Sequence, residues 1–172
     1  MEKSENLKEP HLYADDTQIQ GSCRPESADQ LQSTLSTCLD EVSDWMRSNR
    51  LQLNTAKTEI LWCSTTRQQN HLPSAAVRVG ENHVLPSTTV RDLGIHIDSD
   101  DVAMRSHVSR TVSGCFALLR QLRSIRRSVS DSVFHSLVVS LVMPRLDYGN
   151  ATLAGLPVSQ LRRLQSVLNA AA

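Results

Sequence analysis

Aromatic side chains and long apolar runs are both scarce in this chain of 172 residues. Two Trp, two Tyr and two Phe make up 3% of the residues, so a hydrophobic core must be mainly aliphatic. The longest apolar run, around Ser136 to Pro144, is interrupted by Ser140 and falls far short of the roughly 20 residues of a membrane span. We therefore expect no membrane partner.

The chain also lacks the residue spacings of zinc sites and secretory signals. Its four cysteines form no CxxC pair, and its six histidines form neither HxxxH nor HExxH. Isolated cysteines of this kind are typical of reduced thiols in an intracellular protein. The first ten residues, MEKSENLKEP, are polar. We therefore expect an intracellular protein of the nucleus or cytoplasm that is not secreted.

The formal net charge of zero conceals two halves of opposite charge. Residues 1–101 hold nine basic and sixteen acidic side chains, a net charge of −7, whereas residues 102–172 hold nine basic and two acidic ones, a net charge of +7. A whole-chain average therefore says little about either half. The basic half has the charge expected of a surface that meets nucleic-acid phosphates.

In the first half, the hydrophobic pattern predicts short strands around one long helix. Residues 11–20 predict a hairpin with a polar Asp-Asp pair at its tip. Ser27 and Gln30 have the spacing of a capping box, and apolar residues then recur at helical spacing to about Ser48. Further strands are predicted at 51–53 and 58–64, a hairpin at 77–85, and a strand or strand pair at 89–98. Gly94, inside the last segment, indicates a bulge or a close backbone approach.

After about residue 99 the period becomes helical. Val108, Val112 and Cys115 begin one face that continues to Ile125. A second helix is predicted with Ser130 as its N-cap, and a third near Pro157, a residue that suits a first helical turn. The apolar residues at helical spacing in these two helices are Val133, Leu137, Leu141, Leu161, Leu164 and Leu168. The fold class is therefore α+β.

The segment Tyr13-Ala-Asp-Asp16 carries the clearest chemistry. Adjacent carboxylates repel each other, and a divalent cation relieves that repulsion. Mg²⁺ prefers such hard oxygen ligands, and two ions can clamp the attacking and leaving oxygens of a nucleotidyl transfer. A complete site of this kind needs a third carboxylate from elsewhere in the chain. The alternative is a solvated Asp-Asp turn, which is common.

The order of motifs resembles the reverse transcriptases of non-LTR (LINE-type) retrotransposons. The YADD hairpin is followed by a long helix, by NRLQLNTAKTE at 49–59 and by Asp92-Leu93-Gly94. The tail SLVMPRLDYGN at 140–150, with Gly155-Leu-Pro157 and Leu164-Gln165, also fits this family. The resemblance implies a polar leader (1–10), a partial polymerase palm of antiparallel strands plus one long helix (11–99), and an all-helical thumb (100–172).

The resemblance also implies roles for individual residues. Asp15 is the principal ligand of Mg²⁺ or Mn²⁺, and Asp16 is its neighbour in the same catalytic site. Lys57 is the third catalytic residue, placed to protonate or neutralise the leaving pyrophosphate. The implied partners are an RNA template and a DNA primer. The residues implied or expected to contact nucleic acid are Tyr13, Leu93, Gly94, Arg120, Arg123 and Arg127.

The residues themselves agree with two of these roles. Lys57 is the single lysine beyond the polar leader, and lysine, unlike arginine, can give up a proton. Arg120, Arg123 and Arg127 share a helix face with almost no acidic residue to offset them. The alternatives are a surface lysine in a turn and an ordinary solvated helix face.

Several further residues are expected to be structural. Trp45 and Trp62 each lie on an apolar stretch and are predicted to be in the core. Asp147 and Tyr148 are expected to make helix-end or buried polar contacts. Asp98, Asp100 and Asp101 are poor substitutes for a missing catalytic carboxylate, because they lie at the junction of the implied palm and thumb.

In the family, the fingers and the first metal-binding aspartate precede the YADD segment. Only twelve residues precede Tyr13 here. We therefore expect a reverse transcriptase fragment that is inactive alone and that uses a metal only if the missing fingers and palm segments are supplied. The alternatives are a non-catalytic nucleic-acid-binding remnant and a relic with no selected function.

Overall fold

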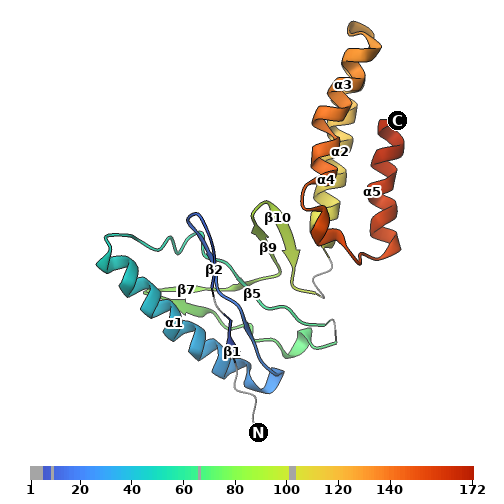
Figure 1. Cartoon of the computed structure of the whole chain (residues 1–172). Helices are drawn as coiled ribbons and strands as arrows, with labels where there is room; N and C mark the ends of the chain where they lie inside the picture. Colours follow the sequence, from blue (N-terminus) through green and yellow to red (C-terminus); the bar gives the residue numbers. More distant parts are fainter. Residues whose placement is uncertain (1–5, 9, 66, 101–103) are drawn as a thin grey trace. The chain divides into compact units, whose positions relative to one another are not determined.

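The computed structural model describes residues 6–8, 10–65, 67–100 and 104–172 (Figure 1). Helices and small sheets both occur, which confirms the α+β class. The chain divides into two compact units, Met1–Thr88 with Ser99–Asp101, and Thr89–Asp98 with Val102–Ala172. The hairpin at Thr89–Asp98 thus belongs with the helices, a grouping that the sequence pattern does not indicate. Within the described residues, none of the helices combines the length and the apolar character needed to cross a membrane.

The first unit is built from one long helix and four two-stranded sheets. Three of the sheets are antiparallel and one is parallel. The strand pairs are β1 (Asn6–Leu7) with β4 (Gly21–Ser22), β2 (His11–Tyr13) with β3 (Asp16–Gln18), β6 (Val77–Val79) with β7 (Asn82–Val84), and the parallel pair β5 (Ile60–Leu61) with β8 (Pro86–Ser87). Short 3₁₀ turns lie at Pro25–Ser27 and Gln69–His71.

Helix α1 (Ala28–Ser48) forms within its predicted bounds and packs on β6. Val77 and Val79 of β6 are fully buried there. The Arg78 guanidinium between them reaches out to Asp40 of α1 with a 2.9 Å bond from one of its two nitrogens, while the second nitrogen bonds the other carboxylate oxygen. This paired contact fixes the β6–β7 hairpin against the helix.

Two expectations for α1 are wrong. Ser27 makes no side-chain cap bond, because it ends a 3₁₀ turn with ψ at 12° and lacks the extended backbone of an N-cap. Trp45 is 60% exposed and is not in the core. Ala28 and Leu31, at the other end of α1, are buried, and Met46 beside Trp45 is only half-buried.

The strands predicted after α1 are shorter than expected. Residues 51–53 form no strand, because the Leu51 N–H still donates to the Met46 carbonyl at the end of α1 (2.8 Å). The segment 58–64 contributes only β5 and an isolated bridge from Ser64 to Asp100. The hairpin predicted at 77–85 is confirmed as β6–β7.

The second unit joins one hairpin to a group of helices. Its strands are β9 (Thr89–Asp92) and β10 (Ile95–Asp98), and its helices are α2 (Arg105–Ile125), α3 (Asp131–Leu141), α4 (Met143–Asp147) and α5 (Val158–Ala171). Further 3₁₀ turns lie at Arg126–Ser128 and Asn150–Leu153. The predicted helical part is confirmed, and the Ser130 hydroxyl caps α3 by accepting the Val133 N–H.

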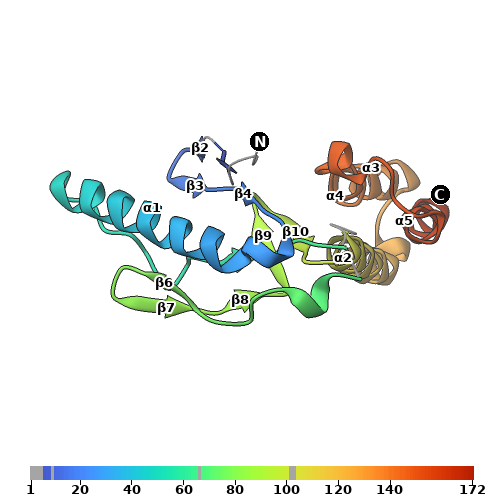
Figure 2. The same cartoon turned by 90° about the horizontal axis from the view of Figure 1, so that it is seen from below.

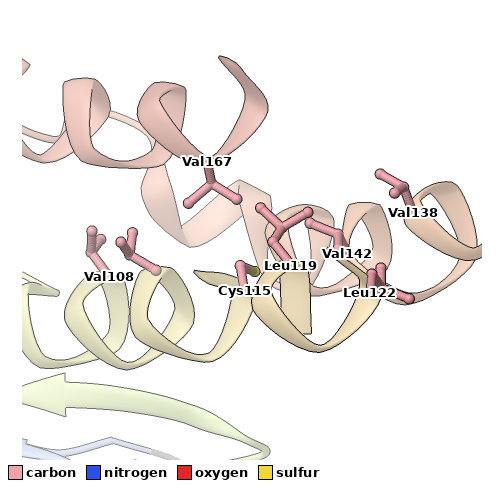
Figure 3. Packing of buried hydrophobic residues seen from close by; sticks show 8 residues of the cluster. Val108, Cys115, Leu119, Leu122, Val138, Val142 and Val167 are labelled. Atoms are coloured by element: carbon pink, nitrogen blue, oxygen red, sulfur yellow. The ribbon is translucent and has the colours of Figure 1, made fainter. Parts of the chain in front are cut away.

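The core of this unit is aliphatic, as the shortage of aromatic residues requires. Buried side chains from α2, α3 and α5, and Val142 between α3 and α4, point toward one another (Figure 3). The inward face of α3 differs from the expected one, since Val138 is buried while Val133 and Leu141 are exposed. This helix is apolar on more than one side, so periodicity alone does not select the buried face. The core residues are Val108, Val112, Cys115, Leu119, Leu122, Val138, Val142 and Val167.

Candidate metal and nucleic-acid site

The Asp-Asp pair lies in a tight hairpin, as predicted. Tyr13 of β2 pairs with Asp16 of β3, which leaves Ala14 and Asp15 as a two-residue turn. Ala14 has a φ of +53°, a left-handed conformation that costs a residue with a Cβ roughly 1–2 kcal/mol. Two-residue hairpin turns require a positive φ of this kind, so the tight connection between β2 and β3 accounts for it.

Both carboxylates of the hairpin are available to a ligand. All residues from 11 to 17 are exposed. Within the part of the chain that the structure describes, no side-chain hydrogen bond or ion pair involves the carboxylate of Asp15 or Asp16, and Asp16 is paired through its backbone alone. The described residues also contain no cluster of three or more His, Cys, Asp or Glu side chains that could hold a metal. The pair therefore offers hard oxygen ligands that suit Mg²⁺, but only as one part of a complete site.

Lys57 lies in a turn on a different side of α1. Its N–H donates to the Asn54 carbonyl (3.0 Å), and the neighbouring Thr55 hydroxyl accepts a 3.1 Å bond from Asn82 of β7. Figure 2 shows α1 between the β2–β3 hairpin and the β6–β7 hairpin. The structure thus brings Asp15 and Asp16 together and holds the exposed Lys57 turn beside β7.

Leu93 and Gly94 form the turn between β9 and β10. Both have positive φ angles, +44° and +85°, and the flanking Asp92 and Ile95 are paired. The sequence indicated a bulge or a close approach at Gly94, and the second is confirmed. A Cβ on this residue would lie 3.2 Å from the ring of Tyr148.

Asp147 and Tyr148 make structural contacts, as expected. Asp147 ends α4 and accepts a 2.7 Å bond from the Asn150 side chain. The Tyr148 hydroxyl donates to the Leu93 carbonyl in the β9–β10 turn. Sequence reasoning missed this partner, because nothing in the local pattern links two residues 55 positions apart.

Asp98 closes the other end of the same hairpin. Its buried carboxylate accepts bonds of 2.9 Å from the Ser106 N–H at the start of α2 and from the Thr89 hydroxyl. Burial opposes ionisation of this group, but the bonds from Ser106 and Thr89 outweigh it and hold its pKa below the ordinary value. Asp98 therefore makes structural bonds within its own unit, which agrees with its prediction as a poor catalytic substitute. Asp101 lies outside the described residues.

His107 is a second buried titratable group that the sequence did not reveal. It lies in the first turn of α2, and its Nδ1 accepts a 3.5 Å bond from the His96 N–H of β10. Burial, and then the charge of His96, lower the pKa of His107. Its neutral form therefore joins α2 to the hairpin beside Asp98.

Arg120 and Arg123 are exposed on α2, and Arg127 is exposed in the 3₁₀ turn that follows. No hydrogen bond or ion pair involves these three cations among the residues that the structure describes. Arg126 differs, because it bonds Asp131 at 2.6 Å and lies 4.6 Å from the centre of the Phe134 ring. Local contacts therefore leave the three expected arginines open to phosphates.

Comparison with protein-family models, with curated proteins and with solved structures finds no match to this chain. The assignment to a polymerase family therefore depends on the sequence motifs. The roles of the catalytic, metal-binding and nucleic-acid-binding residues stay predictions.

Proposed function

We propose that this chain is the palm-and-thumb portion of an RNA-directed DNA polymerase of the non-LTR retrotransposon class, and that it does not extend a primer alone. The observation that carries the proposal is the β2–β3 hairpin, in which the adjacent carboxylates of Asp15 and Asp16 are exposed and have no side-chain partner among the described residues. A structural ion pair or a helix cap would engage such carboxylates, so their openness argues against these two structural roles.

The role proposed for each residue follows from the chemistry of its side chain. Asp15 and Asp16 would hold Mg²⁺ or Mn²⁺, which supplies charge stabilisation for nucleotidyl transfer when it is bound. Lys57 would supply an ammonium group that can donate a proton. The family resemblance implies that a complete catalytic site also requires a further aspartate, which precedes the YADD segment in that family. That requirement is the reason for the proposed inactivity of the chain alone.

Metal binding and primer extension test this proposal together. Mn²⁺ titration of the full chain, followed by electron paramagnetic resonance, should show weak binding that Asp15→Ala removes. The control Asp29→Ala deletes an exposed carboxylate from the first turn of α1 and should leave binding unchanged. Extension of a DNA primer on an RNA template should be absent. Extension that Asp15→Ala abolishes would refute the inactivity, and equal Mn²⁺ binding by all three proteins would refute the metal site.

A second candidate function is nucleic-acid binding without catalysis by the helical unit. The +7 charge of residues 102–172 favours it, as do Arg120, Arg123 and Arg127, whose guanidinium groups have no partner among the described residues. Binding of the full chain to an RNA–DNA duplex should weaken steeply with salt. Replacing Arg123 with alanine should reduce the salt slope by about one, and Arg126→Ala should reduce it less, because Arg126 is already paired. Binding that does not depend on salt would refute this candidate.

A further inference from the structure

Two residues after α4 contact three consecutive residues at the tip of the β9–β10 hairpin. The Tyr148 hydroxyl donates to the Leu93 carbonyl, and its ring lies against Gly94. The next residue, Gly149, faces the side chain of Ile95, whose Cδ1 would be 2.8 Å from a Cβ at position 149. Both glycines have positive φ, so backbone conformation and close packing each favour glycine there.

The side chains at this contact are only partly covered. Tyr148 is 55% exposed and Leu93 is 45% exposed. The burial gained by docking the hairpin tip is therefore modest, yet the hydroxyl of Tyr148 is committed to one backbone carbonyl. A contact that fixes a turn while leaving its apolar side chain in solvent is better suited to presenting that side chain than to building a core.

The base of the hairpin is fixed separately. Asp98 binds the Ser106 N–H and the Thr89 hydroxyl, and His107 accepts the His96 N–H. These contacts hold the base of the hairpin at α2 and do not reach its tip. The Asp92–Ile95 pair ends the ladder directly before the turn, and the Tyr148 hydroxyl holds the Leu93 carbonyl beyond that pair.

We infer that Tyr148 is a positioning residue that, with Gly149, clamps the Leu93–Gly94 turn so that Leu93 meets the end of a DNA primer strand. This inference depends on the proposed function, which assigns that turn to the primer. Tyr148 acts through Leu93 and its own hydroxyl stays on the backbone. The contact supplied by Leu93 is apolar, suited to the sugar and base face of the terminal nucleotide, while arginines supply the affinity for phosphates.

Photocrosslinking with the full chain tests the clamp. The probe is an RNA template–DNA primer duplex with 4-thiothymidine at the 3′ end of the primer, and mass spectrometry locates the attachment. Wild type should crosslink at Leu93 or Gly94. Tyr148→Phe removes only the hydroxyl and should lower crosslinking at the turn about fivefold, the effect of losing one neutral hydrogen bond, with the duplex affinity unchanged. The matched control Thr152→Val deletes a hydroxyl bond to the Gly149 carbonyl in the same loop and should leave crosslinking as in wild type.

Hydrogen exchange of the turn separates positioning from direct contact. Without nucleic acid, Tyr148→Phe should raise amide exchange at residues 93–96 about fivefold, and Thr152→Val should not. Unchanged exchange in Tyr148→Phe overturns the clamp. Faster exchange in Tyr148→Phe together with undiminished crosslinking at the turn would show that Tyr148 does not position Leu93 for the primer. Duplex binding with crosslinks elsewhere overturns the inference alone, whereas absence of duplex binding by wild type overturns the proposed function and this role with it.

Discussion

The contact between Gly149 and Ile95 allows a sharp test of packing in the helical unit. Gly149→Ala places a Cβ 2.8 Å from Ile95 Cδ1 and 3.3 Å from its Cγ1. Gly155 is the matched control, because it also has a positive φ, +80° against +68°, but nothing lies within 4 Å of a Cβ there. Both substitutions place alanine in a left-handed backbone conformation, which costs roughly 1–2 kcal/mol of stability. The difference between their free energies of unfolding therefore reports the steric overlap alone.

The size of that overlap sets the expected difference. Overpacking in a filled site costs about 1–3 kcal/mol, and the lower end applies here because Cδ1 is the far end of a side chain that can rotate. We therefore expect Gly149→Ala to reduce the free energy of unfolding by about 1 kcal/mol more than Gly155→Ala. Ile95→Val deletes the overlapping methyl, so in the double variant the cost should fall below the sum of the single costs by about the same amount.

Urea unfolding followed by far-ultraviolet circular dichroism measures these differences. Trp45 and Trp62 both lie in the first unit, so tryptophan fluorescence follows that unit separately and should not change with any of the variants. Equal destabilisation by Gly149→Ala and Gly155→Ala would refute the reasoning. Strict additivity of Gly149→Ala and Ile95→Val would refute it as well, because the overlap could then not be between these two residues.

Two further predictions concern stability. Val142→Ala should cost about 2 kcal/mol because Val142 is 0% exposed, whereas Val139→Ala, at a position 47% exposed, should cost less than about 0.5 kcal/mol; urea midpoints distinguish them, and similar values would contradict the assigned core. Because the folded-state pKa of Asp98 lies below its unfolded value, its stabilising effect is present above the unfolded pKa and is lost as pH falls through the folded pKa. Unfolding curves measured across the acid range should show this loss in wild type and a smaller one in Asp98→Asn, and identical acid profiles would contradict it.

Elements with a strong local signal were predictable from the sequence. Helix α1 has a clear apolar stripe, the hairpins have turn residues between short strands, and Ser130 has the residue type and place of an N-cap. The β2–β3 hairpin belongs to this group, because a polar Asp-Asp pair between two β-prone stretches is a local turn signal; its turn is Ala14–Asp15, and Asp16 begins β3.

Features that depend on tertiary contacts were not predictable. Trp45 has the spacing of a core residue, but it is 60% exposed near the C-terminal end of α1, and periodicity alone does not show where along the helix its apolar face is covered. The buried face of α3 could not be selected from periodicity, because this helix is apolar on more than one side. Tyr148 and His107 act through partners elsewhere in the chain, and no local pattern indicates which residues those are.

The clamp also has a consequence for the order of folding. The β9–β10 hairpin spans ten residues and has glycine at its turn, so it can form from local contacts on the microsecond timescale of isolated hairpins. Its bond to Tyr148 closes a loop of 55 residues and cannot form until α2 and α3 have brought the chain back. The hairpin should therefore be an early structure that docks late, and replacements at Tyr148 should speed unfolding while leaving the folding rate almost unchanged.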